Sequence, residues 1–174
     1  SKERIPYLVI GSRKELIERF REFLPREMRK KVVGSYLTRA DQDVSEIKKR
    51  SLEVIGDFER EQEDELADIF LEEAGKKVKG AIAGAENVLG YLRDYQVRTL
   101  VIGKDYREAG YVCEDGHHPF LRRGPCPACE GSAISVGDIA DEIIEEAVRQ
   151  KAQIVHFAFP HPDFDRFGIG AILK

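Results

Sequence analysis

The spacing of the hydrophobic positions changes several times along the chain, and each change predicts an element. Apolar residues run without interruption through Tyr7–Ile10, which is typical of a short buried strand. They then recur at helical spacing until Pro25, and a second strand begins at Val32. Ser12 and Glu15 have the spacing of a capping box at the start of this helix. The opening segment therefore predicts a βαβ-like unit that is too short to cover its own sheet.

A long charged helix is predicted over residues 43–74. Its apolar residues form two separate stripes, with the polar stretch Glu59–Glu65 between them. Gly56 interrupts the first stripe, and glycine costs about 1 kcal/mol relative to alanine inside a helix. A helix that loses its apolar stripe midway usually bridges two packing environments. We therefore expect a domain boundary near Gly56, which gives domains at residues 1–55 and 56–174.

Beyond residue 80, short apolar strands alternate with amphipathic helices. These predicted elements occupy residues 80–84, 86–95, 97–102, 137–151, 154–159 and 169–173. Strands that alternate with helices predict the α/β class, with helices layered on a sheet. A segment rich in cysteine and histidine, at about residues 111–131, interrupts the pattern as a small inserted mini-domain.

The composition restricts the possible partners. The net charge of −4 disfavours a generic nucleic-acid binder, and DNA is not an expected partner. Short basic runs are either solvated faces or places where the chain docks on ribosomal RNA. No run approaches the roughly 20 apolar residues that cross a bilayer, so no membrane partner is expected. We expect a cytoplasmic protein, because no secretion leader opens the chain. The chain lacks an initiator methionine, which is typical of a fragment.

The three cysteines predict a metal site. Cys126 and Cys129 form a C-x2-C pair, which lets one tight turn direct two thiolates at a single cation. Cys113, with His117 or His118, completes a tetrahedral Cys3His zinc site, and we favour His117. Four protein ligands leave no open position, so this zinc is expected to be structural. A redox dithiol and unliganded thiols are the alternatives.

Several motifs in order resemble a known family. The segment GAIAGAENVLGYLRDYQVRTLVIGKDYREAGYVC resembles the start of the C-terminal domain of archaeo-eukaryotic class I release factors and their bacterial relatives. The final FGIGAILK resembles the ending shared with Pelota-type ribosome rescue factors. Residues 1–50 are similar to the last strand, helix and strand of the family's middle domain. One departure is Gly116, which stands where the family's first cysteine arm has its second cysteine.

The resemblance implies a fold, a role and partners. The implied fold is the α/β/α sandwich of kink-turn-binding ribosomal proteins, with the zinc-type mini-domain inserted and a partial N-terminal βαβ unit. The implied role is a docking module of a translation termination or rescue factor, with the ribosome and its RNA and a translational GTPase as partners. The family hydrolyses peptidyl-tRNA with a Gly-Gly-Gln loop in the middle domain. This sequence has no Gly-Gly pair, so we assign no catalytic residue and expect no enzyme activity of this chain.

The sequence also offers candidate RNA contacts and two other functions. Asn87 lies where the kink-turn proteins of this fold meet RNA, and Arg122 with Arg123 lies in the cysteine segment. One alternative function is a metal-dependent hydrolase or nuclease that uses His161, Asp163 and Asp165. The other is a kink-turn RNA-binding protein, against which the acidic balance argues.

Overall fold

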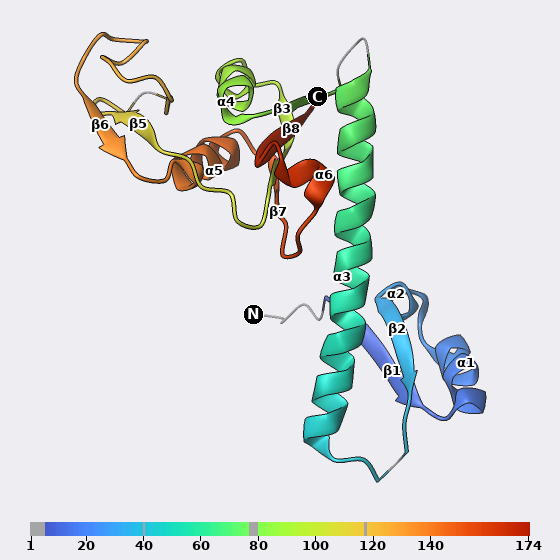
Figure 1. The fold of residues 1–174 in the computed structure, drawn as a ribbon. Helices are drawn as coiled ribbons and strands as arrows, with labels where there is room; N and C mark the ends of the chain where they lie inside the picture. Colours follow the sequence, from blue (N-terminus) through green and yellow to red (C-terminus); the bar gives the residue numbers. More distant parts are fainter. Residues whose placement is uncertain (1–5, 40, 77–79, 117) are drawn as a thin grey trace. The chain divides into compact units, whose positions relative to one another are not determined.

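The computed structural model describes residues 6–39, 41–76, 80–116 and 118–174 (Figure 1). The chain forms two compact units, residues 1–62 and 63–174. The division falls inside one continuous helix, α3 (Val44–Gly75), which matches the long helix predicted from the sequence. The assignment of residues 1–55 and 56–174 to two release-factor domains stays a prediction.

The first unit contains the predicted βαβ arrangement. Strands β1 and β2 run parallel, and two helices connect them. Its elements are β1 (Leu8–Ser12), α1 (Lys14–Phe23), α2 (Arg26–Arg29), β2 (Val32–Leu37) and the first part of α3. The short helix α2 was not predicted.

The predicted capping box at the start of α1 is wrong. The helix begins at Lys14, and Arg13 is the N-cap residue without a side-chain hydrogen bond. Ser12 is instead the last residue of β1, where it pairs with Leu37 and its carbonyl accepts a hydrogen bond from the Thr38 N–H at 3.1 Å. Pairing with β2 therefore holds Ser12 in the strand.

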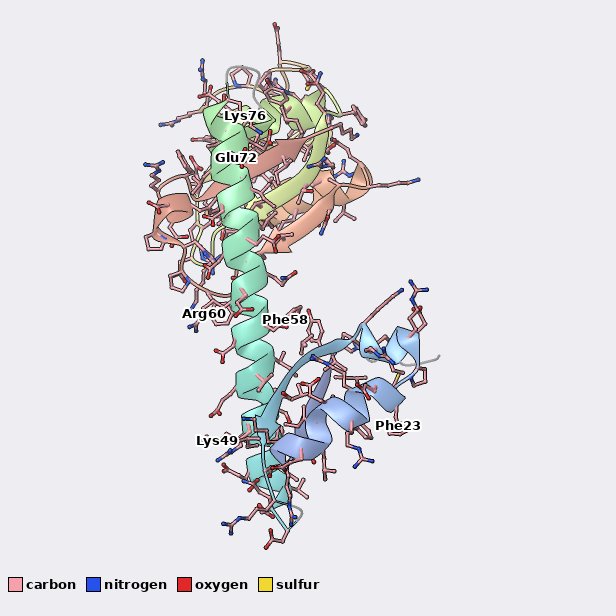
Figure 2. The ribbon with its side chains drawn as sticks, turned by 90° about the vertical axis from the view of Figure 1, so that its right-hand side faces the viewer. Phe23, Lys49, Phe58, Arg60, Glu72 and Lys76 are labelled. Carbon is pink, nitrogen blue, oxygen red and sulfur yellow. The ribbon has the colours of Figure 1, made fainter. Side chains whose placement is uncertain are left out.

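The early turns of α3 pack against this small sheet. The Arg50 guanidinium donates to the carbonyl of Leu37 at 3.1 Å, and the rings of Tyr7 and Phe58 meet edge to face at 5.5 Å. Helix α3 continues through Gly56 without a break, so the low helix propensity of this glycine does not end the helix. On α1, Phe23 is 81% exposed (Figure 2).

The second unit is built on a mixed sheet with the strand order β3-β8-β4-β7. Strand β8 is antiparallel to both of its neighbours, whereas β4 and β7 are parallel. Its strands are β3 (Ala81–Ala83), β4 (Val97–Ile102), β7 (Gln153–His156) and β8 (Ile169–Leu173). The predicted limits of β4 and β8 are confirmed.

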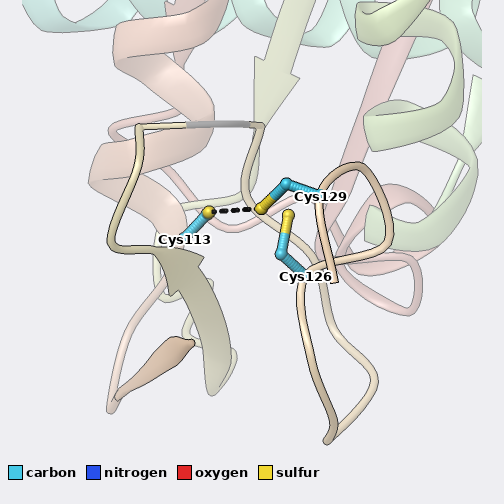
Figure 3. A group of neighbouring side chains, drawn as sticks. All are labelled: Cys113, Cys126 and Cys129. Carbon is cyan, nitrogen blue, oxygen red and sulfur yellow. Dashed lines mark hydrogen bonds between the residues drawn. The ribbon is translucent and has the colours of Figure 1, made fainter. Parts of the chain in front are cut away.

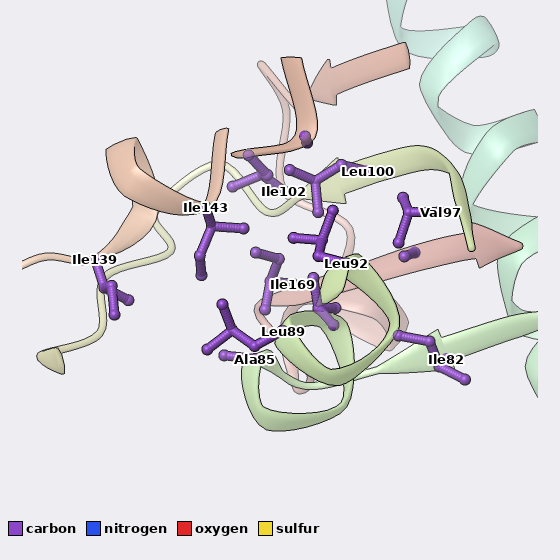
Figure 4. Packing of buried hydrophobic residues seen from close by; sticks show 13 residues of the cluster. Ile82, Ala85, Leu89, Leu92, Val97, Leu100, Ile102, Ile139, Ile143 and Ile169 are labelled. Carbon is purple, nitrogen blue, oxygen red and sulfur yellow. The ribbon is translucent and has the colours of Figure 1, made fainter. Parts of the chain in front are cut away.

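Helices α4 (Ala85–Arg93) and α5 (Ala140–Arg149) cover one face of this sheet. Leu92 of α4 and Ile143 of α5 are fully buried against Leu100 of β4 (Figure 4). Because neighbouring residues of a strand point to opposite faces, Val101 belongs to a second cluster on the other face.

The last turns of α3 and the short helix α6 (Pro162–Asp165) cover that second face. Phe70 of α3 is fully buried, and its ring lies edge to face with Phe164 of α6 at 5.0 Å. Near the end of α3, Lys76 forms an ion pair with Glu72 at 3.2 Å (Figure 2). The unit therefore has three layers of α/β structure. No helix in the described part of the chain is both long and apolar enough to cross a membrane.

Gly170 of β8 allows Phe70 to lie directly on the sheet. A Cβ atom at this position would overlap the Phe70 ring and would lie 3.0 Å from the Ile82 carbonyl oxygen. We expect Gly170→Ala to lower the free energy of unfolding by about 2 kcal/mol, because the added methyl overpacks a closed core. Chemical denaturation measures this loss.

Gly90 provides the matched control, because its added Cβ would meet only the Arg93 guanidinium at 3.9 Å. Within α4, Gly90→Ala should raise the free energy of unfolding by about 0.5 kcal/mol or more. Equal effects at the two glycines would contradict the proposed contact between Phe70 and the sheet.

Candidate metal centre

A two-stranded hairpin carries the cysteine segment. Strand β5 (Gly110–Cys113) pairs antiparallel with β6 (Ala133–Val136), and neither strand was predicted. Residues 111 and 120 also form a bridge, in which the Tyr111 N–H donates to the Phe120 carbonyl at 2.8 Å. Stacking of these two rings, with centroids 5.8 Å apart, encloses a small core with Cys113 and Cys126. The hairpin thus fixes the place where the cysteine arms meet.

The three thiols converge on one point (Figure 3). All three sulfur atoms lie within 4.8 Å of one another, and none is in a disulfide. Cys113 and Cys129 have their sulfur atoms 3.6 Å apart. Zinc–sulfur bonds of about 2.3 Å in a tetrahedron place two sulfurs about 3.8 Å apart. The three side chains can therefore hold one metal ion.

Backbone N–H groups surround the sulfurs. The N–H of Ala128 lies 3.4 Å from the Cys126 sulfur, and the N–H of Gly131 lies 3.4 Å from the Cys129 sulfur. Each donor comes two residues after its cysteine, which is a repeated local turn. Such donors favour the thiolate, the form that binds metals.

The environment of Cys129 combines opposing effects on its thiol. The Gly131 N–H lowers the pKa of the Cys129 thiol, but desolvation and the neighbouring thiols of Cys113 and Cys126 outweigh it. The net result is a pKa raised to about 11 from the ordinary 9.0. A cation at the centre would reverse this balance, because it stabilises thiolates directly.

The structure describes one of the two candidate histidines. His117 lies outside the described residues, so its role as fourth ligand stays a prediction. The Nδ1 atom of His118 lies 3.3 Å from the Oε2 atom of Glu146 on α5. This contact is not a hydrogen bond, because the buried His118 Nδ1 atom has no hydrogen-bond partner among the described residues. Glu146 is 3% exposed and accepts a hydrogen bond from Gln150 at 2.7 Å. His118 thus joins the mini-domain to α5.

The carboxylate of Asp115, which was not predicted as a site residue, lies beside Cys129 at the edge of the cluster. The Oδ2 atom of Asp115 lies 3.6 Å from the sulfur of Cys129. One feature of the sequence could have indicated Asp115: it directly precedes Gly116, which stands where the family has its second cysteine.

The candidate RNA contacts lie on and near α4. Asn87 is exposed, and its side-chain amide donates to the Ala83 carbonyl at 2.8 Å, which fixes the first turn of α4. Arg122 forms an ion pair with Glu86 at 2.7 Å, and Arg123 is exposed. RNA contact by these residues stays a prediction.

The loop named in the hydrolase alternative contains a buried histidine. The ring of His161 is 5% exposed and lies against two carboxylates of α3. Its Nε2 atom is 3.1 Å from Glu63 and its Nδ1 atom is 3.0 Å from Asp64. The carboxylate of Asp165 accepts the backbone N–H of His161 at 3.0 Å, whereas Asp163 is exposed. Within the described residues these three side chains form no metal cluster, since the cysteines alone do.

Comparisons with known proteins identify the fold. No family model matches the sequence, and no curated protein matches it either. A solved C-terminal domain of a peptide chain release factor from Methanosarcina mazei is similar, with a TM-score of 0.57 and 25% identity. The match covers 78% of this chain and 97% of that domain.

Two longer proteins share the fold. Pelota from Archaeoglobus fulgidus matches with a TM-score of 0.53 and 16% identity, over 97% of this chain and 49% of its own. Dom34 from S. cerevisiae matches with a TM-score of 0.56 and 12% identity, over 97% of this chain and 46% of its own. The chain therefore spans about half the length of these two proteins. The resemblance predicted from the sequence is confirmed, because the chain is similar to a release-factor C-terminal domain and shares the fold of Pelota and Dom34.

Proposed function

We propose that this chain is a docking module of a ribosome-associated translation termination or rescue factor. The observation that carries the proposal is the match to the release-factor domain of Methanosarcina mazei, which covers 97% of that domain at 25% identity. The fold shared with Dom34, described as a translation termination-like factor that interacts with Hbs1, supports the same role. Partners of this chain would be the ribosome with its RNA and a translational GTPase.

The module would act by binding and would catalyse no reaction itself. Its sequence offers no Gly-Gly-Gln loop, and the His161 ring is held between carboxylates of α3 at 3.0 and 3.1 Å. A general base needs a free nitrogen within reach of a substrate proton. The contacts of His161 instead favour a structural role.

The cysteine cluster would hold a structural zinc ion. Zinc prefers tetrahedral sites with sulfur and nitrogen or oxygen ligands, and the 3.6 Å separation of the Cys113 and Cys129 sulfurs fits such a site. Residue 117 is the fourth ligand predicted from the sequence. The metal would fix the loop that carries Arg122 and Arg123.

These two arginines are the proposed contact with ribosomal RNA. Arg122 is 86% exposed and forms an ion pair with Glu86, whose side chain is 68% exposed. An exposed pair of this kind contributes little to stability and leaves the guanidinium accessible. Exposed guanidinium groups bind phosphate oxygens and release counterions, which makes binding dependent on salt. The surface formed by Arg122 and Arg123 is therefore expected to make salt-dependent contacts.

Cosedimentation of the chain with ribosomes from the same organism tests this function. We expect the double variant Arg122→Glu/Arg123→Glu to bind about tenfold more weakly, with a salt slope smaller by about 2. Arg98→Glu/Lys104→Glu is the matched control, because both residues are exposed in the same unit and the charge change is identical.

The outcomes separate two claims. If the unaltered chain remains in the supernatant, the docking function is wrong. If it sediments with ribosomes and both double variants behave alike, docking stands and the arginine surface is not the contact.

A further inference from the structure

We propose that Asp115 is the fourth ligand of the metal, which makes the centre a Cys3Asp site. This inference rests on the proposed zinc ion and names a residue outside the predicted set. In a tetrahedral zinc site, one sulfur ligand and one oxygen ligand lie about 3.5 Å apart. The Asp115 Oδ2 atom lies 3.6 Å from the Cys129 sulfur, which matches that separation.

The local turn explains why the carboxylate reaches the sulfurs. The Gly116 N–H donates to the carbonyl of Cys113 at 3.0 Å, so the chain reverses directly after the first cysteine. Gly116 has φ +76°, a left-handed conformation that glycine adopts without steric cost. This reversal of the chain places Asp115 on the side of the turn where the Cys129 sulfur lies.

A glycine on the opposite arm makes room for the carboxylate. A Cβ atom at Gly131 would lie 3.1 Å from the Cys129 sulfur and 3.2 Å from the Asp115 Oδ2 atom. Both groups therefore share one small space that a larger residue would close. The group of ligand atoms that lie within 4.8 Å of one another contains the three cysteines without Asp115, whose printed contact is with Cys129. Because Asp115 is exposed, a rotation of its side chain on metal binding would bring an oxygen nearer to the other two sulfurs.

The described histidine has a different partner. His118 points its Nδ1 atom at Glu146, whose carboxylate also lies 3.2 Å from the Arg149 guanidinium. The Nδ1 contact alone would not prevent His118 from binding a metal through its other ring nitrogen, but neither nitrogen of His118 belongs to the described group of ligand atoms that lie within 4.8 Å of one another. Carboxylate oxygen is an accepted zinc ligand alongside thiolate. Binding would replace the protons of three thiols by one cation, giving a site with a net charge of −2 from one carboxylate and three thiolates.

Cobalt(II) binding to the full chain tests the assignment. Cobalt reports both the number of thiolates, by charge-transfer absorption, and tetrahedral geometry, by visible absorption. We expect Asp115→Asn to lower the affinity about 100-fold, measured by chelator competition. Asp115→Cys should restore binding and raise charge-transfer intensity by about one third, because four thiolates replace three. Glu114→Gln, the neighbouring exposed carboxylate, is the control that should bind as the unaltered chain does.

Each result has a distinct meaning. If the unaltered chain binds neither cobalt nor zinc, the zinc proposal itself is wrong. If it binds the metal and Asp115→Asn binds equally well, Asp115 is not the ligand. Loss of binding in His117→Ala alone would assign that position to the histidine. Far-UV circular dichroism of each variant checks that the sheet and helices remain, and metal binding by Asp115→Cys would show that position 115 tolerates a change.

Discussion

Replacing Glu63 by alanine should lower the free energy of unfolding by about 3 kcal/mol. Glu63 lies on α3 with its side chain 13% exposed, and its carboxylate holds the loop between β7 and α6. Its two oxygens accept the backbone N–H groups of Ala158 at 2.9 Å and Phe159 at 3.1 Å. The second oxygen also meets the buried His161 ring at 3.1 Å. Glu63→Ala leaves the two backbone N–H groups and the His161 ring without this partner at the same time. We expect a large loss because three contacts are lost together.

Urea denaturation of the full chain, monitored by circular dichroism, measures this loss. Glu63→Gln should give a smaller loss, because the amide keeps one acceptor oxygen of the same shape. Glu65→Ala is the control on the same helix, since Glu65 is exposed, and it should change stability by less than about 0.5 kcal/mol. A Glu63→Ala protein as stable as Glu65→Ala would show that the carboxylate does not hold the loop.

Glu63 also shows where sequence reasoning stops. The polar stretch Glu59–Glu65 predicted a helix that bridges two packing environments, but it did not reveal that the partners of Glu63 lie 95 to 98 residues later in the chain. For the same reason no partner of His161 was predicted. Local spacing does not reveal which distant loop a charged side chain will meet. The break in the apolar stripe was nevertheless a real signal, because it marks where a half-buried carboxylate replaces apolar contact.

The elements that were predicted correctly depend on local patterns. Both faces of β4 and β8 are covered, so their apolar runs begin and end where the strands do, at Val97–Ile102 and Ile169–Leu173. The hairpin of β5 and β6 was missed because its strands are four residues long and 19 residues of cysteine-rich loop separate them. The C-x2-C spacing of Cys126 and Cys129, together with the nearby Cys113, was enough to predict that the three thiols meet at one site. The closeness of Asp115 to Cys129 could not be predicted, because it depends on how the two cysteine arms meet in space.

If the proposed zinc ion is bound, removing it should unfold the mini-domain and leave the α/β layers of the second unit intact. The core of the mini-domain is small: Cys113, Phe120 and Cys126 are its buried members, with Tyr111 and Ala133 packed beside them. A core of this size does not offset the conformational entropy of the ordered loop. Structural zinc contributes about 10 kcal/mol or more in small metal-dependent domains, so the ion would supply most of the order here.

Hydrogen exchange measured with and without a chelator tests this expectation. Amide protection in β5 and β6 should fall at least about a thousandfold after chelation, whereas the amides of β4 and β8 keep theirs, because separate cooperative units open independently. Cys126→Ser should show the same loss without chelator and no further change when chelator is added. Protection of the hairpin that is equal in both conditions would mean that the packing of Tyr111 on Phe120 orders the mini-domain without a metal. Loss of protection throughout the second unit would instead mean that the contact of His118 with Glu146 couples the mini-domain to the sheet, since α5 lies between the hairpin and β4.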